Sequence, residues 1–367
     1  MTRPTMLFHA PYPIHGRATG SGVRPAKMRQ AFTDAGYDVI EIAGHGAERA
    51  RALRELRWKL YRGLRLDFAY GENSTMPTLL TEPHHLPTHP AVDLSLLRLL
   101  HRHRVPTGMF YRDVYWRFPA YVQDVGRLIA TGTTTLYHAE LLAMRRWLNR
   151  IYLPSQKMAP MVPWIRPEQT APLPPGAAVH DSRREAVGEL TALYVGNVSE
   201  YYRMHELFRA VDATAGVRLI FCTPPESWDA VREQYPLGSS GRIEVVHARG
   251  EELLPLFARA HLTLLTVEPT RYRDFAAPVK LFEYIGHGKP VLATTGTHAG
   301  DLVSELGAGA QVPYSSERIA AALAALRDDR TELTALTDRV EAVRHEHTWS
   351  ARARTVAADL AALDTRG

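Results

Sequence analysis

The chain has 367 residues, more than one hydrophobic core usually holds, so we expect two domains. Hydrophobic residues make up 45% and charged residues 23%, which fits a globular protein, and no apolar run approaches the ~20 residues of a membrane span. No charged-then-apolar signal segment opens the sequence. The single cysteine, Cys222, excludes an internal disulfide framework and predicts a cytoplasmic location.

Charge is distributed unevenly between the two halves of the chain. Residues 1–160 hold 22 Lys and Arg against 12 Asp and Glu, a net charge of +10, whereas residues 161–367 hold 22 against 27, a net charge of −5. A strongly basic half indicates an anionic partner. Because no DNA- or RNA-binding motif accompanies the charge, we expect a lipid surface or an anionic substrate and no nucleic acid; the alternative is a solvated basic face.

The first 43 residues have the order of a doubly wound α/β sheet. We expect a strand at 5–10, a Pro- and Gly-rich loop at 11–22, a helix at 23–34 and a strand at 37–43. The loop lacks a full GxGxxG motif, so it does not predict a tightly bound dinucleotide. Gly20, Ser21 and Gly22 at the helix start can still hold an anion with backbone amides.

Residues 47–65 predict an amphipathic helix with seven Lys and Arg residues. Its leucines recur at helical spacing, and Trp58 and Tyr61 stand beside the basic residues. Basic and aromatic residues on one amphipathic helix are typical of an element that lies on an anionic membrane. Core packing with a solvated basic face is the alternative.

Residues 66–90 predict a short strand that runs into a long polar loop. Glu72 and Asn73 follow this strand directly, at the position where substrates are contacted in such sheets, and are acceptor-site candidates. His84, His85 and His89 suggest a metal site, but they lie among prolines without an acidic partner at ligand spacing. We expect loop histidines and no metal.

Asp113 follows the predicted strand 105–112, which comes after a helix at 92–103. Tyr111, Tyr115 and Trp116 surround this aspartate, and apolar surroundings raise the pKa of a carboxylate toward that of a general base. We expect Asp113 to be catalytic and the three aromatic residues to be acceptor contacts. The alternative is a helix N-cap, for which Asp is favoured.

A Pro-rich segment at 159–179 breaks the periodic pattern and indicates an interdomain linker. The helix-rich stretch before it ends in a helix at 138–150 and a strand at 151–155. A second α/β series follows the linker. We expect strands at 191–197, 217–222, 243–248 and 261–267 and helices at 205–213 and 252–260. Two open sheets with their strand ends across one cleft are the predicted architecture.

The stretch 279–300 predicts a helix, a Gly-His-Gly-Lys-Pro turn, a strand and a Thr- and Gly-rich loop. Glu283 in this helix can accept hydrogen bonds from two vicinal hydroxyls, as on a ribose. Lys280 lies on the same face and can meet a phosphate. An ordinary αβ connection with a solvated Glu283 is the alternative.

The chain resembles the GT-B glycosyltransferases, particularly bacterial family 4-like enzymes of exopolysaccharide synthesis. The residues that carry the resemblance are YVGN…YYRM at 194–204, the strand–helix–strand at 245–266, and PVKLFEYIGHGKPVLAT at 278–294. The ending HTWSARA is similar to the final helix that crosses back to the first domain. The resemblance implies domains at 1–158 and 181–345, a linker at 159–180 and a crossing helix at 346–367.

The resemblance also assigns roles to individual residues. It implies that Glu283 binds the donor ribose, that Lys280 and Arg203 meet the diphosphate, and that Asp113 occupies the position of the N-domain catalytic residue. Further donor contacts are implied at Gly196, Asn197, His247 and Arg249, and donor phosphate or acceptor contacts at Gly20, Ser21 and Gly22.

One departure from the family pattern bears on mechanism. Retaining members usually carry a glutamate eight positions before the ribose-binding one, where this chain has Phe275. This favours inversion, with Asp113 deprotonating an acceptor hydroxyl and positive groups stabilising the leaving diphosphate. The sequence has no DxD triplet, so we expect no cofactor or metal.

We therefore expect a metal-independent transfer from a nucleotide sugar to a saccharide or lipid-linked acceptor, with peripheral association at an anionic membrane. The alternatives are a retaining enzyme of the same fold, a nucleotide-sugar epimerase, or a binding protein that has lost catalysis. An epimerase needs further acid and base groups, for which Glu72, Asp113 and Asp274 are the candidates.

Overall fold

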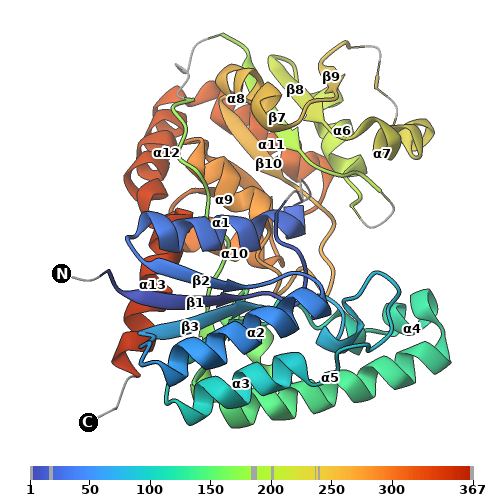
Figure 1. Ribbon diagram of the computed structural model, residues 1–367. Helices are drawn as coiled ribbons and strands as arrows, with labels where there is room; N and C mark the ends of the chain where they lie inside the picture. The colour runs from blue at the N-terminus through green and yellow to red at the C-terminus, as the bar shows by residue number, and fades with distance from the viewer. Residues whose placement is uncertain are drawn as a thin grey trace. The chain divides into compact units, whose positions relative to one another are not determined.

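The computed structural model describes residues 3–15, 20–182, 188–199, 202–235, 237–238 and 240–363 (Figure 1). The chain divides into two compact units. The N-terminal unit contains Met1–Pro174 and Trp349–Gly367, and the C-terminal unit contains Pro175–Thr348. The first division falls inside the predicted linker, and the second lies close to the predicted boundary at 345/346.

The N-terminal unit is built on a six-stranded parallel sheet of order β2-β1-β3-β4-β5-β6. Its central strands are short apolar runs buried on both faces, as parallel strands covered by helices require. Met6 on β1 pairs with Val39 on one side and Phe68 on the other. The strands are β1 (Thr5–His9), β2 (Asp38–Ile42), β3 (Phe68–Glu72), β4 (Thr107–Phe110), β5 (Arg150–Leu153) and β6 (Thr170–Pro172).

Helices cover both faces of this sheet. On one face α1 and α13 share a core with the strands, and on the other α2 and α3 bury a row of leucines. Asp359 on α13 holds Arg150 of β5 at 2.7 Å and accepts a 2.9 Å hydrogen bond from Tyr152. The helices are α1 (Gly20–Asp34), α2 (Gly46–Tyr61), α3 (Val92–Arg102), α4 (Pro119–Val125), α5 (Arg127–Trp147) and α13 (Trp349–Ala362).

Two local predictions in this unit need correction. The Pro-rich segment is not only a linker, because Thr170–Pro172 forms the outermost strand, β6. Proline is tolerated there since an edge strand leaves one side of its backbone unpaired. The helix predicted at 47–65 ends at Tyr61, where Gly63 takes a positive φ of 94°. Its leucines are core residues, and Trp58 and Tyr61 are exposed.

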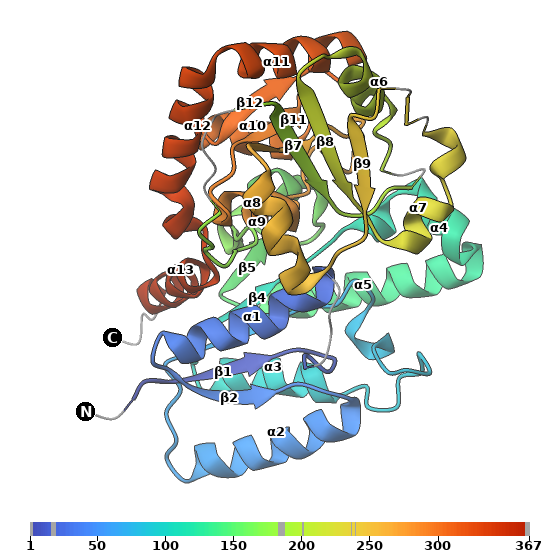
Figure 2. The same cartoon turned by 90° about the horizontal axis from the view of Figure 1, so that it is seen from above.

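The C-terminal unit has a second six-stranded parallel sheet, of order β12-β11-β10-β7-β8-β9. Figure 2 shows α8 and α9 on one side of it and α6 and α11 on the other. The strands are β7 (Leu190–Val195), β8 (Val217–Cys222), β9 (Ile243–Val246), β10 (Leu262–Leu265), β11 (Val291–Thr294) and β12 (Gly309–Val312). The helices are α6 (His205–Ala213), α7 (Pro225–Asp229), α8 (Leu254–Arg259), α9 (Val279–Gly286), α10 (His298–Glu305), α11 (Ser316–Asp328) and α12 (Arg330–Val343).

Single 3-10 turns fill several of the connections. In the N-terminal unit they are η1 (Thr78–Leu80), η2 (Tyr115–Arg117), η3 (Gln156–Met161) and η4 (Pro167–Gln169). In the C-terminal unit they are η5 (Arg232–Gln234), η6 (Gly250–Leu253) and η7 (Arg344–His347). Cys222, the free cysteine, is buried at the end of β8, as expected of a structural thiol.

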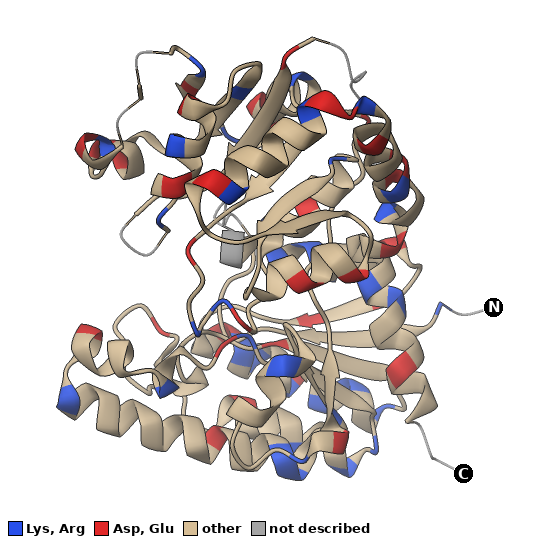
Figure 3. Cartoon of the chain, turned by 180° about the vertical axis from the view of Figure 1, so that it is seen from behind, with Lys and Arg blue, Asp and Glu red and all other residues tan. Residues whose placement is uncertain are grey.

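The surfaces of the two units differ in their charge. In Figure 3 acidic and basic residues are interspersed on the long helices of the C-terminal unit, where Arg339 pairs with Glu332 at 2.8 Å. On α2 of the N-terminal unit the exposed residues are mainly basic or aromatic. None of the helices in the described part of the chain combines the length and apolarity needed to cross a bilayer.

Candidate functional site

A group of polar side chains lies at the carboxyl end of β7. The Lys280 amine donates a 2.9 Å hydrogen bond to the Tyr194 hydroxyl, and it lies 4.7 Å from the ring centre of Tyr194 and 5.1 Å from that of Tyr202. The Tyr194 hydroxyl in turn donates to the backbone oxygen of Asn197 at 2.7 Å. Gly196 has a φ of 149°, and a Cβ there would overlap the Lys280 amine. The structure therefore brings Gly196, Asn197 and Lys280 together.

Helix α9 is placed by its apolar face. Leu281, Phe282 and Ile285 are buried, and the Tyr284 hydroxyl bonds both backbone groups of Val195 at 2.9 and 3.2 Å. These contacts fix the first turn of α9 beside the end of β7, where its free backbone amides favour an anion.

Glu283 lies one turn after Lys280 on the polar side of α9, and its side chain is exposed. Partial desolvation by the surrounding protein raises the pKa of its carboxyl, while the positive charge of Lys280 acts in the opposite direction. Burial lowers the pKa of Lys280 to about 8, although Tyr202 and Glu283 oppose the shift. A cation held in low dielectric beside a helix N-terminus suits a phosphate.

Arg273 belongs to the same group and was missed by the sequence analysis. Its guanidinium lies 5.0 Å from the ring centre of Tyr202, on which Lys280 also lies, and it donates to the backbone oxygen of Glu268. Burial lowers the pKa of Arg273 as well. Its only sequence signal is its place in the loop before α9. The site therefore contains two cations, Lys280 and Arg273.

The remaining predicted donor residues are exposed and lie on loops after the strands. Arg203 follows β7, and its backbone oxygen accepts from the Tyr314 hydroxyl at 3.0 Å. His247 and Arg249 follow β9, the edge strand, where His247 Nδ1 bonds the Thr223 oxygen at 2.7 Å. Arg249 is the N-cap residue of the 3-10 helix η6 (Gly250–Leu253).

Phe275 occupies the position at which retaining members of the family usually carry a second glutamate. It is only 2% exposed and packs edge-on against Tyr272, with ring centres 5.1 Å apart. The neighbouring Asp274 is exposed. A side chain buried in this way offers no carboxylate to a ligand, so the position takes part in packing.

Asp113 lies after β4 in the N-terminal unit and is half-buried. Its carboxylate accepts a hydrogen bond from the backbone amide of Tyr115, which closes a local turn before the 3-10 helix η2 (Tyr115–Arg117). The cap residue of that helix is Val114, so Asp113 is not the N-cap that the sequence offered as an alternative.

Two of the three predicted aromatic contacts are core residues. Trp116 donates a 3.0 Å hydrogen bond to the Tyr111 hydroxyl and stacks on Tyr137 of α5 with ring centres 4.9 Å apart. Trp116 is 7% and Tyr111 2% exposed, so neither presents an open ring face for a sugar. Tyr115 is the half-buried one, and its hydroxyl donates to Asp124.

Glu72 is a buried structural carboxylate and not an acceptor contact. It is fully buried, pairs with Arg24 at 2.9 Å and accepts a 2.6 Å hydrogen bond from Tyr70. The guanidinium carbon of Arg24 lies over the ring of Phe110, 3.5 Å from the ring centre. Gly20, Ser21 and Gly22 form the first turn of the same helix, α1; the neighbouring residues 16–19 and the side chains of residues 20 and 21 lie outside the described part.

Asn73 does face a cavity, together with an acidic residue that the sequence analysis missed. Glu140 on α5 accepts a 3.4 Å hydrogen bond from Asn73 and further bonds from the amide and hydroxyl of Thr78. Burial raises the pKa of the Glu140 carboxyl to about 7, against the lowering effect of the Thr78 hydrogen bonds. Glu140 is the only acidic residue of α5, which is a weak signal at sequence level.

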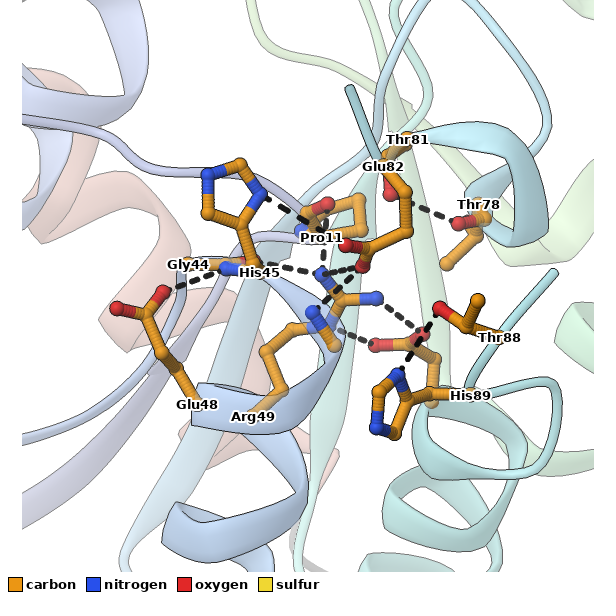
Figure 4. Close-up of polar contacts among 12 residues, drawn as sticks. Pro11, Gly44, His45, Glu48, Arg49, Thr78, Thr81, Glu82, Thr88 and His89 are labelled. Carbon is orange, nitrogen blue, oxygen red and sulfur yellow. Dashed lines mark hydrogen bonds and ion pairs between the residues drawn. The ribbon is translucent and has the colours of Figure 1, made fainter. Parts of the chain in front are cut away.

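A buried ion cluster connects the loops at this edge of the sheet. Figure 4 shows Arg49 reaching from α2 to the backbone oxygens of Pro11 and Gly44, at 2.9 and 2.6 Å, with Glu82 beside it. Asp93 on α3 completes the cluster 3.0 Å from Arg49. One of the seven basic residues of the predicted helix is therefore structural and cannot face a membrane.

The three loop histidines make local hydrogen bonds. His84 accepts one from the Leu86 amide at 3.1 Å, His85 bonds the Leu80 oxygen at 3.0 Å, and His89 bonds Thr88 at 3.1 Å. Within the described ranges, no three or more His, Cys, Asp or Glu side chains are arranged to hold a metal ion.

Comparison with known proteins identifies the fold. Residues 189–329 match the family model of glycosyl transferases group 1. No curated protein sequence matches the chain. The chain is similar in structure to Anabaena HepE in complex with UDP and glucose, with a TM-score of 0.64, 14% identity and coverage of 98% of this chain and 100% of that one.

Two further solved structures agree. The sucrose-phosphate synthase of Thermosynechococcus elongatus has a TM-score of 0.61 at 16% identity, with all of both chains covered. WaaG, a glycosyltransferase involved in lipopolysaccharide biosynthesis, has a TM-score of 0.57 at 15% identity, with 99% of this chain and 100% of that one covered. The fold predicted from sequence, two Rossmann-like units of the GT-B type, is confirmed.

Proposed function

We propose that the chain, a glycosyltransferase of the GT-B type with a group 1 glycosyl transferase domain at residues 189–329, transfers a sugar from a nucleoside-diphosphate sugar to an acceptor hydroxyl. The observation that carries this proposal is the group at the end of β7, where Lys280 and Arg273 share Tyr202 and Glu283 follows one turn later. Two cations, one in the loop before α9 and one in its first turn, followed by a carboxylate on the same helix, match a diphosphate followed by a ribose.

In this proposal the C-terminal unit holds the donor. Lys280, Arg273 and the amides at the start of α9 bind the diphosphate, and Glu283 accepts hydrogen bonds from the two ribose hydroxyls. Arg203, His247 and Arg249 lie on loops at the carboxyl ends of β7 and β9 and are proposed donor contacts. UDP-sugars are the first donors to test, since the HepE structures contain UDP and UDP-glucose.

Asp113 is the proposed general base, and the transfer is proposed to invert the anomeric centre. The acceptor O–H proton passes to the Asp113 carboxylate, the oxygen attacks the anomeric carbon, and the bond from that carbon to the diphosphate breaks. The positive charge of Lys280 and Arg273 stabilises the leaving diphosphate, as a metal ion does in other transferases. The buried Phe275 supports inversion, because it supplies no second carboxylate.

The N-terminal unit is proposed to take a saccharide or lipid-linked acceptor at an anionic membrane surface. Trp58 is 58% and Tyr61 90% exposed at the end of α2, and Arg62 lies 4.6 Å from the Trp58 ring centre. Flotation with anionic vesicles tests this. The double variant Trp58→Ser, Tyr61→Ser is expected to bind vesicles less than the wild type, and equal binding would contradict a role for α2.

The test of the donor is a thermal-shift panel of nucleoside diphosphates and nucleotide sugars. A true donor raises the melting temperature by mass action, and Glu283→Ala is expected to weaken that shift for nucleosides with a ribose. A panel without any stabilising nucleotide would contradict the proposal. Product analysis separates the alternatives, because an epimerase changes the sugar of the donor without any acceptor.

The test of the base is Asp113→Asn, with Asp124→Asn as the matched control. An amide oxygen can still accept from the Tyr115 amide, so the turn survives while the base is lost. We expect a loss of about 10²–10⁴ in kcat for Asp113→Asn, as is typical of general-base removal. Asp124 accepts from the Tyr115 hydroxyl at 2.5 Å on the exposed helix α4, and its variant is expected to keep its turnover. Equal turnover in both variants would contradict the assignment.

A further inference from the structure

The N-terminal unit contains a partly enclosed cavity of about 80 Å³ that the donor site does not use. It lies between the sheet and the helices α3 and α5, under the loop that follows β3. Its wall is formed by the strand residues His9 and Met109, by helix residues such as Leu97, Leu136 and Met144, and by the loop residues Pro77 and Leu79.

Most of the cavity wall is apolar, and the two methionines are buried, Met109 at 6% and Met144 at 1% exposure. Leu94, which also lines the cavity, is 37% exposed and marks its outer side. Cavities lined by such side chains stay dry and bind apolar molecules, and one of ~150 Å³ accepts benzene. This one therefore fits an alkyl group of about three or four carbon atoms.

The cavity also has polar lining residues. His9, Asn73, Asp93 and Glu140 line it, and Glu140 is held by Asn73 at 3.4 Å. His9 Nε2 lies 3.3 Å from Asp93, and its Nδ1 donates to the Ile42 oxygen at 2.9 Å, so this pair is engaged within the protein. Glu140 is engaged as well, by Asn73 and by the amide and hydroxyl of Thr78, but a carboxylate accepts up to about four hydrogen bonds, so Glu140 can still accept one from a ligand hydroxyl beside Asn73.

The loop of the proposed base packs against the helix that carries Glu140. Burial raises the pKa of the Tyr111 hydroxyl, and the charges of Glu140 and Asp113 both raise it further. The same two carboxylates also raise the pKa of Tyr137. Trp116, three residues after Asp113, stacks on Tyr137, which lies one turn before Glu140 on α5. The loop that carries Asp113 therefore packs against the part of α5 that carries Glu140.

We propose that this cavity binds a short alkyl group carried by the acceptor, with an adjacent acceptor hydroxyl held by Asn73 and Glu140. The inference rests on the proposed function, since it names the acceptor class for the same reaction. It makes the N-terminal unit selective for acceptors with an apolar substituent next to the reacting sugar. A plain hydrophilic saccharide leaves the apolar wall unfilled.

The test is site-specific and needs no turnover. With methionine methyl groups labelled by carbon-13, n-butyl β-D-glucoside is expected to shift the signals of Met109 and Met144. The signals of Met28 and Met204, buried in other cores, serve as internal references. Methyl β-D-glucoside is expected to shift none of them. Butyl glucoside leaving the Met109 and Met144 signals in place would overturn the proposal.

The length of the alkyl group on the glucoside gives a quantitative test through the affinity. Affinity is expected to rise by about fourfold per added methylene from methyl to butyl, the factor for burying one CH₂, and then to level off at pentyl and hexyl. Affinity that rises through hexyl without any shift of the two methionine signals would mean surface binding and would overturn the assignment.

A filling variant gives an independent check. Ala139 on α5 lines the cavity, and Ala139→Phe is expected to abolish the methionine shifts; Ala321→Phe, on the exposed side of α11, is the matched control. The thermal shift with UDP-glucose reports the C-terminal unit separately. If UDP-glucose does not raise the melting temperature but butyl glucoside still shifts the methionine signals, only the proposed function is contradicted. If UDP-glucose raises the melting temperature but butyl glucoside leaves the methionine signals in place, only the cavity assignment is contradicted.

Discussion

The Lys280 amine occupies the space in which a side chain at position 196 would lie, so the glycine and the lysine form one structural element. Gly196→Ala is expected to displace Lys280 from Tyr194 and to weaken donor binding by about 10–100-fold, the value of one charge-assisted hydrogen bond. Isothermal titration with the stabilising nucleotide measures the change.

The control for this variant is Gly241→Ala. Gly241 has a φ of 65°, and no other atom lies within 4 Å of the point that a Cβ would occupy there, so alanine brings backbone strain without touching Lys280. We expect it to lower stability but not donor affinity. If both variants bound the donor equally well, the contact between residues 196 and 280 would not matter for the donor.

Donor affinity is expected to depend on pH through Lys280. Its pKa is lowered to about 8, so the free protein loses this charge as pH rises through 8, whereas an unperturbed lysine stays charged until about pH 10. We expect affinity for UDP-glucose to fall between about pH 7 and 9. Lys280→Arg is expected to remove this dependence because arginine stays charged, and a pH profile identical to that of the wild type would contradict the role of Lys280.

The buried pair of Arg24 and Glu72 is expected to dominate the stability of the N-terminal unit. Glu72→Gln leaves the Arg24 charge buried without its partner, which typically costs about 3–5 kcal/mol. The matched control is Glu332→Gln, which breaks the half-exposed pair with Arg339 and should cost at most about 1 kcal/mol. Differential scanning calorimetry measures both, and similar melting temperatures would contradict a structural role for Glu72.

Glu140 makes stability depend on pH in the opposite direction from most carboxylates. Because its folded pKa of about 7 exceeds its ordinary value of 4.5, the folded state holds a proton that the unfolded state has released. Stability is therefore expected to fall as pH rises from about 4.5 to 7 and then to level off. Glu140→Gln, which cannot ionise, is expected to be more stable than the wild type at pH 8 by on the order of 1–2 kcal/mol.

Chemical denaturation at pH 5 and at pH 8 measures the difference in the free energy of unfolding between the wild type and Glu140→Gln. The difference should be small at the lower pH, where Glu140 is protonated. A constant difference across the range would mean that Glu140 does not titrate between these values.

The sequence predicted what short-range patterns determine. Continuous apolar runs identified most strands within one to three residues, and VRLIFC matches β8 fully. The placement of Lys280 and Glu283 on one helix face also followed from spacing alone. β6 was missed because its prolines suggested a linker. Proline is tolerated in an edge strand, but the position of a strand in the sheet cannot be read from its own residues.

Long-range partners determined what the sequence could not predict. Glu72 looked like an acceptor contact because it follows a strand, but Arg24, 48 residues earlier, makes it structural. Glu140 was missed because its partners Asn73 and Thr78 lie 67 and 62 residues away. Acceptor contacts were predicted at Tyr111 and Trp116, but both are buried, and burial against α5 leaves no local mark on the sequence.

The C-terminal helix α13 belongs to the N-terminal unit, whose core contains Trp349, Val356 and Leu360. During synthesis the chain emerges from the ribosome in order, and domains fold as units. All of Pro175–Thr348 is therefore available to fold before α13 exists, while the first 174 residues still lack one layer of their core. We therefore expect the N-terminal unit to complete its core only after α13 has been made.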